Sequence, residues 1–142
     1  MGFGRRAEPS DGKGLDAYEQ VDITDAGRMS DLVARVKPDW IFHLAGVFRS
    51  EPIETFRINF MGTVSLLEAT RTGAPDARVV VVGSAAEYGI VQESDLPLTE
   101  ETSCHPKGAY GVSKHASTLL ALDYATRTNM KVVVARPFNS IG

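Results

Sequence analysis

The side chains best suited to chemistry in this sequence are a serine, a tyrosine and a lysine. Tyr110 and Lys114 are four residues apart in a helical stretch, so their side chains are expected on one face of that helix. Ser84 follows a run of valines, where a buried parallel strand would end and where such sheets hold their ligands. An ammonium group beside a phenol favours the phenolate, and a serine hydroxyl can share a substrate oxygen with the tyrosine. The three residues predict a site that moves a proton on or off a carbonyl or an alcohol.

Other reactive side chains carry weaker signals. His43 ends an apolar run without a partner cluster, which is typical of a structural residue rather than a base or a ligand. His105 and His115 are expected on the solvent side. Cys104, the single cysteine, follows a polar loop and lacks a matched base, so a nucleophile is not expected there. Residues 12–14 (Gly-Lys-Gly) lack the preceding strand and following helix of a phosphate loop.

Strands and helices alternate along the chain and must position these residues. Three apolar runs have the composition of strands buried on both faces of a parallel sheet, and a weaker run precedes them. The runs span residues 40–45, 79–83 and 131–135, and the weaker one spans residues 18–23. Helical patterns span residues 25–37, 50–73 and 110–128. The alternation predicts an α/β fold with a doubly wound parallel sheet.

The composition excludes several classes of protein. The 142 residues are 43% hydrophobic and carry a net charge of −3, which argues against disorder and against bulk nucleic-acid binding. One cysteine leaves no intramolecular disulfide and no Cys/His spacing typical of a metal cluster. Neither a membrane-spanning run nor a signal peptide is evident. We therefore expect one domain over residues 1–142, cytoplasmic, with neither a membrane nor a nucleic-acid partner.

Six motifs occur in order along nearly the whole chain. They are residues 21–25, 43–46, 59–69, Ser84 with its neighbours, Tyr110 with Lys114, and residues 136–142. With these motifs the sequence resembles the extended short-chain dehydrogenase/reductase superfamily, the NAD-dependent epimerases and dehydratases. The resemblance implies a Rossmann fold, an NAD or NADP cofactor and a nucleotide-sugar substrate.

The resemblance also implies a role for each matching residue. Ser84, Tyr110 and Lys114 would be catalytic, and Lys114 would also hold the nicotinamide ribose. Ser84, Glu87 and Asn139 would contact the substrate, with Asn139 on its diphosphate, although packing near Tyr88 is an equal alternative for Glu87. The other residues implied to line the cofactor are Asp22, Ile23, Leu44, Ala45, Gly46, Asn59, Pro137 and Phe138. Among them, Asp22 would accept from the adenine amino group, with Ile23 beside the ring.

The residues after Ser84 discriminate between the reactions of the superfamily. Its sugar 4,6-dehydratases carry an Asp-Glu pair where this sequence has Ala85 and Ala86, which cannot do proton chemistry, so dehydration is not expected. Residues 83–89 and 136–142 look most like the GDP-4-keto-6-deoxymannose reductases. An NAD-dependent 4-epimerase is the alternative enzyme, and a non-catalytic module that folds or oligomerises is the alternative class. Residues 5–6, both arginine, would either pair with the 2′-phosphate of NADP or form a solvated basic end.

The first strand and the Gly-x-x-Gly-x-x-Gly loop of the superfamily have no counterpart in this sequence, nor does its substrate domain. We therefore expect a truncated domain that is inactive in isolation. In the sheet order 3-2-1-4-5-6, the missing first strand would separate residues 18–23 from residues 40–45, and right-handed crossovers would place the three helices on one face. The opposite apolar face and a strand edge would meet water, which predicts self-association.

Overall fold

Parallel strands alternate with helices in the computed structural model, which describes residues 1–5, 16–48 and 51–138. The strands are β1 (Gly2–Gly4), β2 (Tyr18–Gln20), β3 (Trp40–His43), β4 (Arg78–Val82) and β5 (Lys131–Ala135). The helices are α1 (Ala26–Val36), α2 (Pro52–Phe56), α3 (Gly62–Gly73) and α4 (Gly108–Thr128). A π-helical turn, Arg57–Met61, joins α2 to α3, and two 3-10 turns, Ala85–Glu87 and Glu93–Asp95, lie between β4 and α4. The predicted α/β class is confirmed.

The strands form two separate sheets rather than one. β1 pairs with β2, and β3, β4 and β5 form the second sheet in that order, with every pair parallel. The separation predicted between residues 18–23 and residues 40–45 is therefore confirmed. β2 is shorter than predicted because Asp22 Oδ1 accepts hydrogen bonds from the backbone N–H (2.9 Å) and the hydroxyl (2.8 Å) of Thr24, which turns the chain toward α1.

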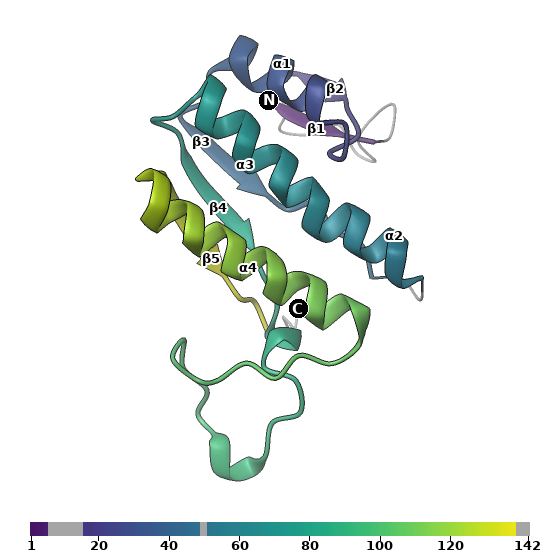
Figure 1. Ribbon diagram of the computed structural model, residues 1–142, viewed down its shortest axis with the longest axis vertical. Coiled ribbons are helices and arrows are strands. Elements are labelled where there is room, and N and C mark those ends of the chain that lie inside the picture. Colours follow the sequence, from purple (N-terminus) through teal and green to yellow (C-terminus); the bar gives the residue numbers. More distant parts are fainter. Residues whose placement is uncertain (6–15, 49–50, 139–142) are drawn as a thin grey trace.

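The helices cover one face of the strands, as predicted. Figure 1 shows α3 and α4 in front of β3, β4 and β5, with α1 beside α3. The inward residues of these strands, such as Ile41, Val79 and Val81, belong to the core together with Leu66 and Leu67 of α3. No helix in the described part of the chain is long and apolar enough to cross a membrane.

The opposite face of the three apolar strands is open, as the predicted placement of the helices implies, although the composition of these strands is that of strands buried on both faces. Outward side chains stay exposed: Trp40 by 52%, Phe42 by 61% and Val133 by 62%. Their inward neighbours alternate with them and are buried or partly buried against the helices. Apolar composition on both faces of a strand indicates that both faces can be covered, but here the described residues provide a helical layer for one face alone.

The helix predicted over residues 50–73 contains a local irregularity. Its π-helical turn carries Asn59, which is 1% exposed and lies between α4 and the segment that follows β3. Turns of this kind are rare and occur frequently at functional sites.

The first helix, α1, is capped by Asp25, whose side chain accepts from the backbone N–H of Arg28 (3.0 Å). It ends at Lys37, which has a positive φ of 46°.

Candidate active site at the carboxyl ends of β3 and β4

Ser84 lies two residues beyond β4 and caps the 3-10 turn that follows. Its Oγ accepts from the backbone N–H of Ala86 (3.1 Å), and its own N–H donates to Glu87 Oε1 (2.9 Å). This reciprocal pair is a capping box, so the backbone around Ser84 is fixed by the turn itself. A hydroxyl has one proton and two lone pairs, so the Ser84 Oγ–H remains a donor after this contact.

Lys114 reaches the same end of β4 from α4. Its Nζ donates to the carbonyl oxygen of Val82, the last residue of the strand. The side chain is buried, and desolvation lowers the pKa of the ammonium group, while the Glu87 carboxylate acts in the opposite direction. Gly46, in the segment after β3, lies beside the Lys114 ammonium group. If Gly46 carried a side chain, its Cβ would lie 3.8 Å from Lys114 Nζ and 3.4 Å from Asn59 Oδ1.

Tyr110 lies one turn before Lys114 in the first turn of α4. Its ring is half-buried and packs edge-on against Phe48, with ring centroids 5.1 Å apart and an interplanar angle of 69°. Phe48 belongs to the segment after β3, so Tyr110 lies near the end of β3. Lys114, on the same helix, contacts the end of β4. The structure thus places the three predicted catalytic residues at the carboxyl ends of two neighbouring parallel strands.

Asn59 serves as a buried connection between these segments. Its Oδ1 accepts from Val47 N–H (2.8 Å), and its Nδ2 donates to Val47 O (3.0 Å) and to Ser113 Oγ (3.0 Å). Ser113 Oγ in turn donates to the carbonyl oxygen of Tyr110 (2.8 Å). With these partners Asn59 holds the backbone after β3 and the first turn of α4, and its expected contact with a cofactor stays a prediction.

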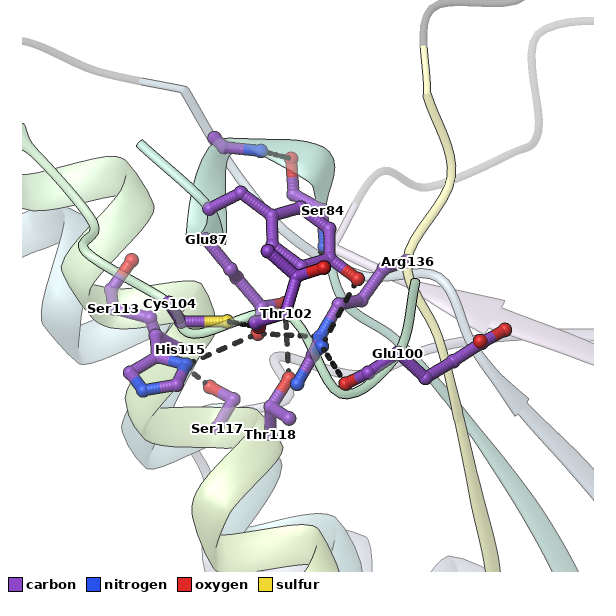
Figure 2. A network of polar contacts seen from close by, with 12 residues as sticks. Ser84, Glu87, Glu100, Thr102, Cys104, Ser113, His115, Ser117, Thr118 and Arg136 are labelled. Carbon is purple, nitrogen blue, oxygen red and sulfur yellow. Dashed lines mark hydrogen bonds and ion pairs between the residues drawn. The ribbon is translucent and has the colours of Figure 1, made fainter. Parts of the chain in front are cut away.

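Glu87 is the centre of a buried polar network, shown in Figure 2 with His115 on one side and Arg136 on the other. Oε1 accepts from Ser84 N–H (2.9 Å) and Thr118 Oγ1 (3.0 Å), and Oε2 lies 3.1 Å from Arg136 Nε and 3.4 Å from His115 Nδ1. The carboxylate is fully buried. Of the two alternatives for Glu87, the structure favours packing over a substrate contact, because its oxygens are enclosed by protein donors.

The same network corrects the expectation for one histidine and brings three potential metal ligands together. His115 is not on the solvent side, since its side chain is 23% exposed and faces Glu87, whereas His105 is exposed as predicted. Glu87, Cys104 and His115 each bring a ligand atom within 4.8 Å of the others, although their sequence spacing is not that of a metal site. Arg136 and Thr118 already engage the carboxylate, so this cluster works as an ion-pair network.

His43 is buried at the end of β3 and has a structural partner. Its Nε2 lies 2.9 Å from Thr63 Oγ1, and that hydroxyl donates to the carbonyl oxygen of Asn59 (2.6 Å). Because the Thr63 proton is used there, His43 Nε2 is the donor in the pair. Burial, with a smaller contribution from the positive charge of Lys114, lowers the pKa of His43 to about 4. The ring is therefore neutral at pH 7 and has the structural role predicted for it.

The residues expected around an adenine ring differ in exposure. Asp22 is half-buried, and the hydrogen bonds from Thr24 lower the pKa of its carboxyl group, with a further contribution from Arg57. Ile23 is 7% exposed and packs in the core, where a Cβ at Gly62 would come within 2.7 Å of Ile23 Cγ2. The Ile23 side chain is therefore part of the core, and its expected place beside an adenine ring stays a prediction.

The remaining cofactor candidates lie at the open ends of β3 and β5. Leu44 is 73% exposed, Ala45 packs partly against the core, and Gly46 is exposed. Pro137 and Phe138 are exposed after β5, and the Phe138 ring stacks on Tyr88 with centroids 6.1 Å apart. Arg5 is exposed at the end of β1, with its Nη1 3.9 Å from Glu54 Oε1. Arg6 and Asn139 lie outside the described residues.

Four polar residues of these networks were missed by the sequence reasoning. Ser113, Ser117 and Thr118 form a stripe of small hydroxyl residues along α4, and Ser117 Oγ donates to the carbonyl oxygens of Asn59 (3.0 Å) and Ser113 (2.9 Å). Arg136 was noted as part of a motif without a role. The sequence feature that could have revealed the three hydroxyl residues is their position on a helix where an apolar face is expected. Buried hydroxyl groups need hydrogen-bond partners, so their presence there indicates a polar network.

Parallel strands that alternate with helices, with polar side chains at the carboxyl ends of the strands, define a Rossmann-type fold, and the comparisons with known proteins bear this out. The model of the NAD dependent epimerase/dehydratase family matches residues 2–142. The chain belongs to this family.

Individual relatives include both reductases and epimerases. The chain is 37% identical over 134 residues to a GDP-6-deoxy-D-mannose reductase of Pseudomonas aeruginosa, covering 90% of this chain and 43% of the relative. The structure of RMD from Pseudomonas aeruginosa complexed with NADPH superposes with a TM-score of 0.81 at 31% identity, covering 99% of this chain and 53% of that one. The structure of UDP-glucose 4-epimerase from Brucella ovis in complex with NAD superposes with a TM-score of 0.83 at 26% identity. The match covers 92% of this chain and 41% of that one. The chain spans less than half the length of the curated relatives it matches.

Proposed function

We propose that this chain supplies the proton-transfer side of an NAD(P)H-dependent nucleotide-sugar reductase that converts a 4-keto-6-deoxyhexose into a 6-deoxyhexose. The observation that carries the proposal is the placement of Ser84 and Lys114 at the end of β4, with Tyr110 one turn before Lys114 on α4. The similarity to a GDP-6-deoxy-D-mannose reductase supports the substrate class. Residues 1–142 would form its truncated NAD(P)-binding Rossmann-like domain.

Each of the three residues has a defined task in this reaction. A reduced nicotinamide, when bound, would supply the hydride for C4 of the keto sugar. The Tyr110 hydroxyl gives its proton to the C4 oxygen, so that the carbonyl becomes an alcohol. The Ser84 Oγ–H donates to the same oxygen and holds it in place. The Lys114 ammonium stabilises the negative charge that remains on Tyr110 after the transfer.

Several residues fit part of a dinucleotide. Lys114 Nζ has three protons and uses one on Val82, which leaves two for the hydroxyls of a ribose. Gly46 exposes backbone beside that ammonium group, and Asp22 is an ionised acceptor at the end of β2. Pro137 and Phe138 offer exposed apolar surface after β5 for a nicotinamide ring. The choice between NAD and NADP would depend on the arginines at residues 5–6.

The alternative reaction is the 4-epimerisation of a nucleotide sugar. It would use the same three groups with a tightly kept NAD, and the similarity to a UDP-glucose 4-epimerase that binds NAD favours it as the second candidate. Dehydration is not proposed, because Ala85 and Ala86 follow Ser84 and neither carries a group that can exchange a proton.

The decisive experiment measures turnover with substitutions at the proton donor. Any NADPH oxidation that the chain shows with GDP-4-keto-6-deoxymannose should depend on the proton donor, so we expect Tyr110→Phe to lower its kcat at least about 100-fold while NADPH binding is retained. Turnover that persists in Tyr110→Phe would refute the assignment. Interconversion of UDP-glucose and UDP-galactose would favour the epimerase. No turnover with either substrate, in a folded protein, would favour a non-catalytic module.

We also propose that a second copy of the chain covers the open face of the β3–β5 sheet. Trp40, Phe42, Leu44 and Val133 expose large apolar side chains on this part of the molecule. Contiguous exposed apolar surface on a folded protein is typical of an association site.

A further inference from the structure

A buried carboxylate and a buried ammonium group bind the backbone on either side of Gly83. Lys114 Nζ, from α4, donates to the carbonyl oxygen of Val82. Glu87 Oε1, from the 3-10 turn after β4, accepts from the N–H of Ser84 (2.9 Å). Val82 and Ser84 are the two neighbours of Gly83 in the chain, so both charges are attached to the same short stretch of backbone at the end of β4.

Gly83 leaves the room that the carboxylate occupies. If Gly83 carried a side chain, its Cβ would collide with Glu87 Oε1 and would lie 3.3 Å from the carbonyl oxygen of Ala135. The Glu87 side chain that fills this space is fully buried. A well-packed neutral side chain in the same place would avoid the cost of burying a charge. The charge of Glu87, rather than its volume, is therefore the feature that needs a functional reason.

The donors around Glu87 fix the carboxylate relative to α4. Thr118 Oγ1 donates to Oε1 (3.0 Å) and Arg136 Nε donates to Oε2 (3.1 Å), and Figure 2 shows both side chains beside Glu87. Thr118 lies one turn after Lys114 on α4. Because the helix that carries the lysine is also bonded to the carboxylate, the fold fixes where the two opposite charges lie relative to each other.

The carboxylate acts on the charge of the lysine. Burial lowers the pKa of the Lys114 ammonium group, and the Glu87 carboxylate opposes this effect. His43, at the end of β3, is neutral at pH 7 because burial lowers its pKa to about 4, so it brings no charge to Lys114. Arg136 binds the carboxylate at Oε2, whereas Oε1 lies on the side of Ser84.

Other titratable groups on α4 and on the segments packed against it have different positions or partners. Tyr110 lies one turn before Lys114 on α4, and His115 and Cys104 lie against Glu87. The ion pairs of α2 with the π-helical turn, of α3 and of β5 are Glu54 with Arg57, Glu68 with Arg71, and Asp76 with Lys131.

We propose that Glu87 is a positioning residue of the candidate site: its Oε1 fixes the Ser84 backbone, and its charge keeps Lys114 in the ammonium form. This inference rests on the proposed function, because it gives Glu87 a role in the same proton transfer. In this role Glu87 touches neither substrate nor cofactor and acts through Ser84 and Lys114. The ammonium form is the one that stabilises a phenolate at Tyr110, so the carboxylate sets the pH range in which Lys114 can do so.

The test is an NMR titration of Lys114 in the chain alone, observed at its side-chain Cε, with the exposed Lys107 as internal reference. Glu87→Gln removes the charge and keeps an oxygen that can accept from Ser84 N–H. We expect the titration midpoint of Lys114 to fall by at least about 0.5 pH unit. Hydrogen exchange of the Ser84 amide should stay within about threefold of that in the unaltered chain, because its acceptor is retained.

A second variant covers the case in which Glu87→Gln does not fold, since it leaves the Arg136 guanidinium without its carboxylate. The double variant Glu87→Gln/Arg136→Gln removes both charges of the pair. We expect it to fold and to show the same fall in the Lys114 midpoint. The matched control, Thr118→Val, removes one donor to Glu87 and leaves the charge in place, so the Lys114 midpoint should stay within about 0.2 pH unit of its value in the unaltered chain.

The outcomes separate this inference from the proposed reaction, because the titration needs neither cofactor nor substrate. An unchanged Lys114 midpoint in a folded Gln variant would overturn the role of Glu87, even in a chain that turns over the keto sugar. An equal fall in Thr118→Val would overturn it as well, since a general disturbance of the network would then explain the effect. A lower midpoint in the Gln variants of a chain without turnover would support the role of Glu87 and contradict the proposed reaction.

Discussion

At the scale of single residues, the sequence predicted the positions of the candidate reactive groups better than the partners of the polar groups around them. Ser84 and Lys114 lie at the end of β4, and Tyr110 lies one turn before Lys114 on α4, while their catalytic roles stay predictions. Glu87 and Asn59 are instead enclosed by protein donors and acceptors. A polar residue at a strand end has the same sequence signature whether it meets a ligand or a buried partner, because the partners come from distant parts of the chain.

His43 provides a prediction on the pH dependence of stability. Its pKa is about 4 in the folded state and near 6.5 in the unfolded state, so the unfolded state binds the extra proton between these values. The free energy of unfolding should therefore be unaffected by His43 above about pH 6.5 and should fall as the pH is lowered toward 4, by up to about 3 kcal/mol.

Urea unfolding of the protein and of His43→Gln between pH 4 and pH 7.5 measures this contribution. Glutamine keeps an N–H donor for Thr63 and does not titrate, so the difference between the two proteins isolates the histidine. Identical pH dependence in both proteins would contradict the buried, neutral state of His43.

At the scale of elements, the alternation of strands and helices was predictable from composition, and the coverage of the strands was predictable only from the handedness of the crossovers. Apolar runs at residues 79–83 and 131–135 correctly indicated β4 and β5. These strands are not buried on both faces, although their composition would allow it. Whether a face is buried depends on which helices are present to pack on it. The π-helical turn at Asn59 could not be predicted from the spacing of the apolar residues. A π-turn changes the backbone hydrogen-bond register, and no particular residue type marks that change.

Glu87 joins the 3-10 turn after β4, the helix α4 and the segment after β5. Glu87→Gln leaves the Arg136 guanidinium without its carboxylate in a largely buried position, so we expect a loss of about 3–5 kcal/mol in the free energy of unfolding. Denaturant unfolding measures the loss.

The matched control for this prediction is Asp123→Asn. Asp123 pairs with Arg127 at 3.0 Å on the exposed face of α4, and both side chains are more than half exposed. Loss of this ion pair should lower the free energy of unfolding by less than about 0.5 kcal/mol. Equal effects of the two substitutions would show that burial of the Glu87 network contributes nothing.

At the scale of the whole molecule, the open face of the second sheet leads to a prediction on association. Light scattering of the purified chain should show a mass that rises with concentration, because Trp40, Phe42 and Val133 are better buried against a second copy than in water. Val133→Lys should shift the mass toward that of a monomer. A strictly monomeric protein that binds no hydrophobic dye would contradict this interface.

The central claim is that the ends of β3 and β4 form a dinucleotide-dependent proton-transfer site organised by Lys114. Calorimetric titration with NADPH tests it most directly, using the unaltered chain, Lys114→Ala and the exposed control Lys107→Ala, each verified as folded by circular dichroism. We predict micromolar binding by the unaltered chain and by Lys107→Ala, and a loss of at least about tenfold in Lys114→Ala. Equal affinity of all three proteins for NADPH, or no binding by the unaltered chain, would contradict the claim.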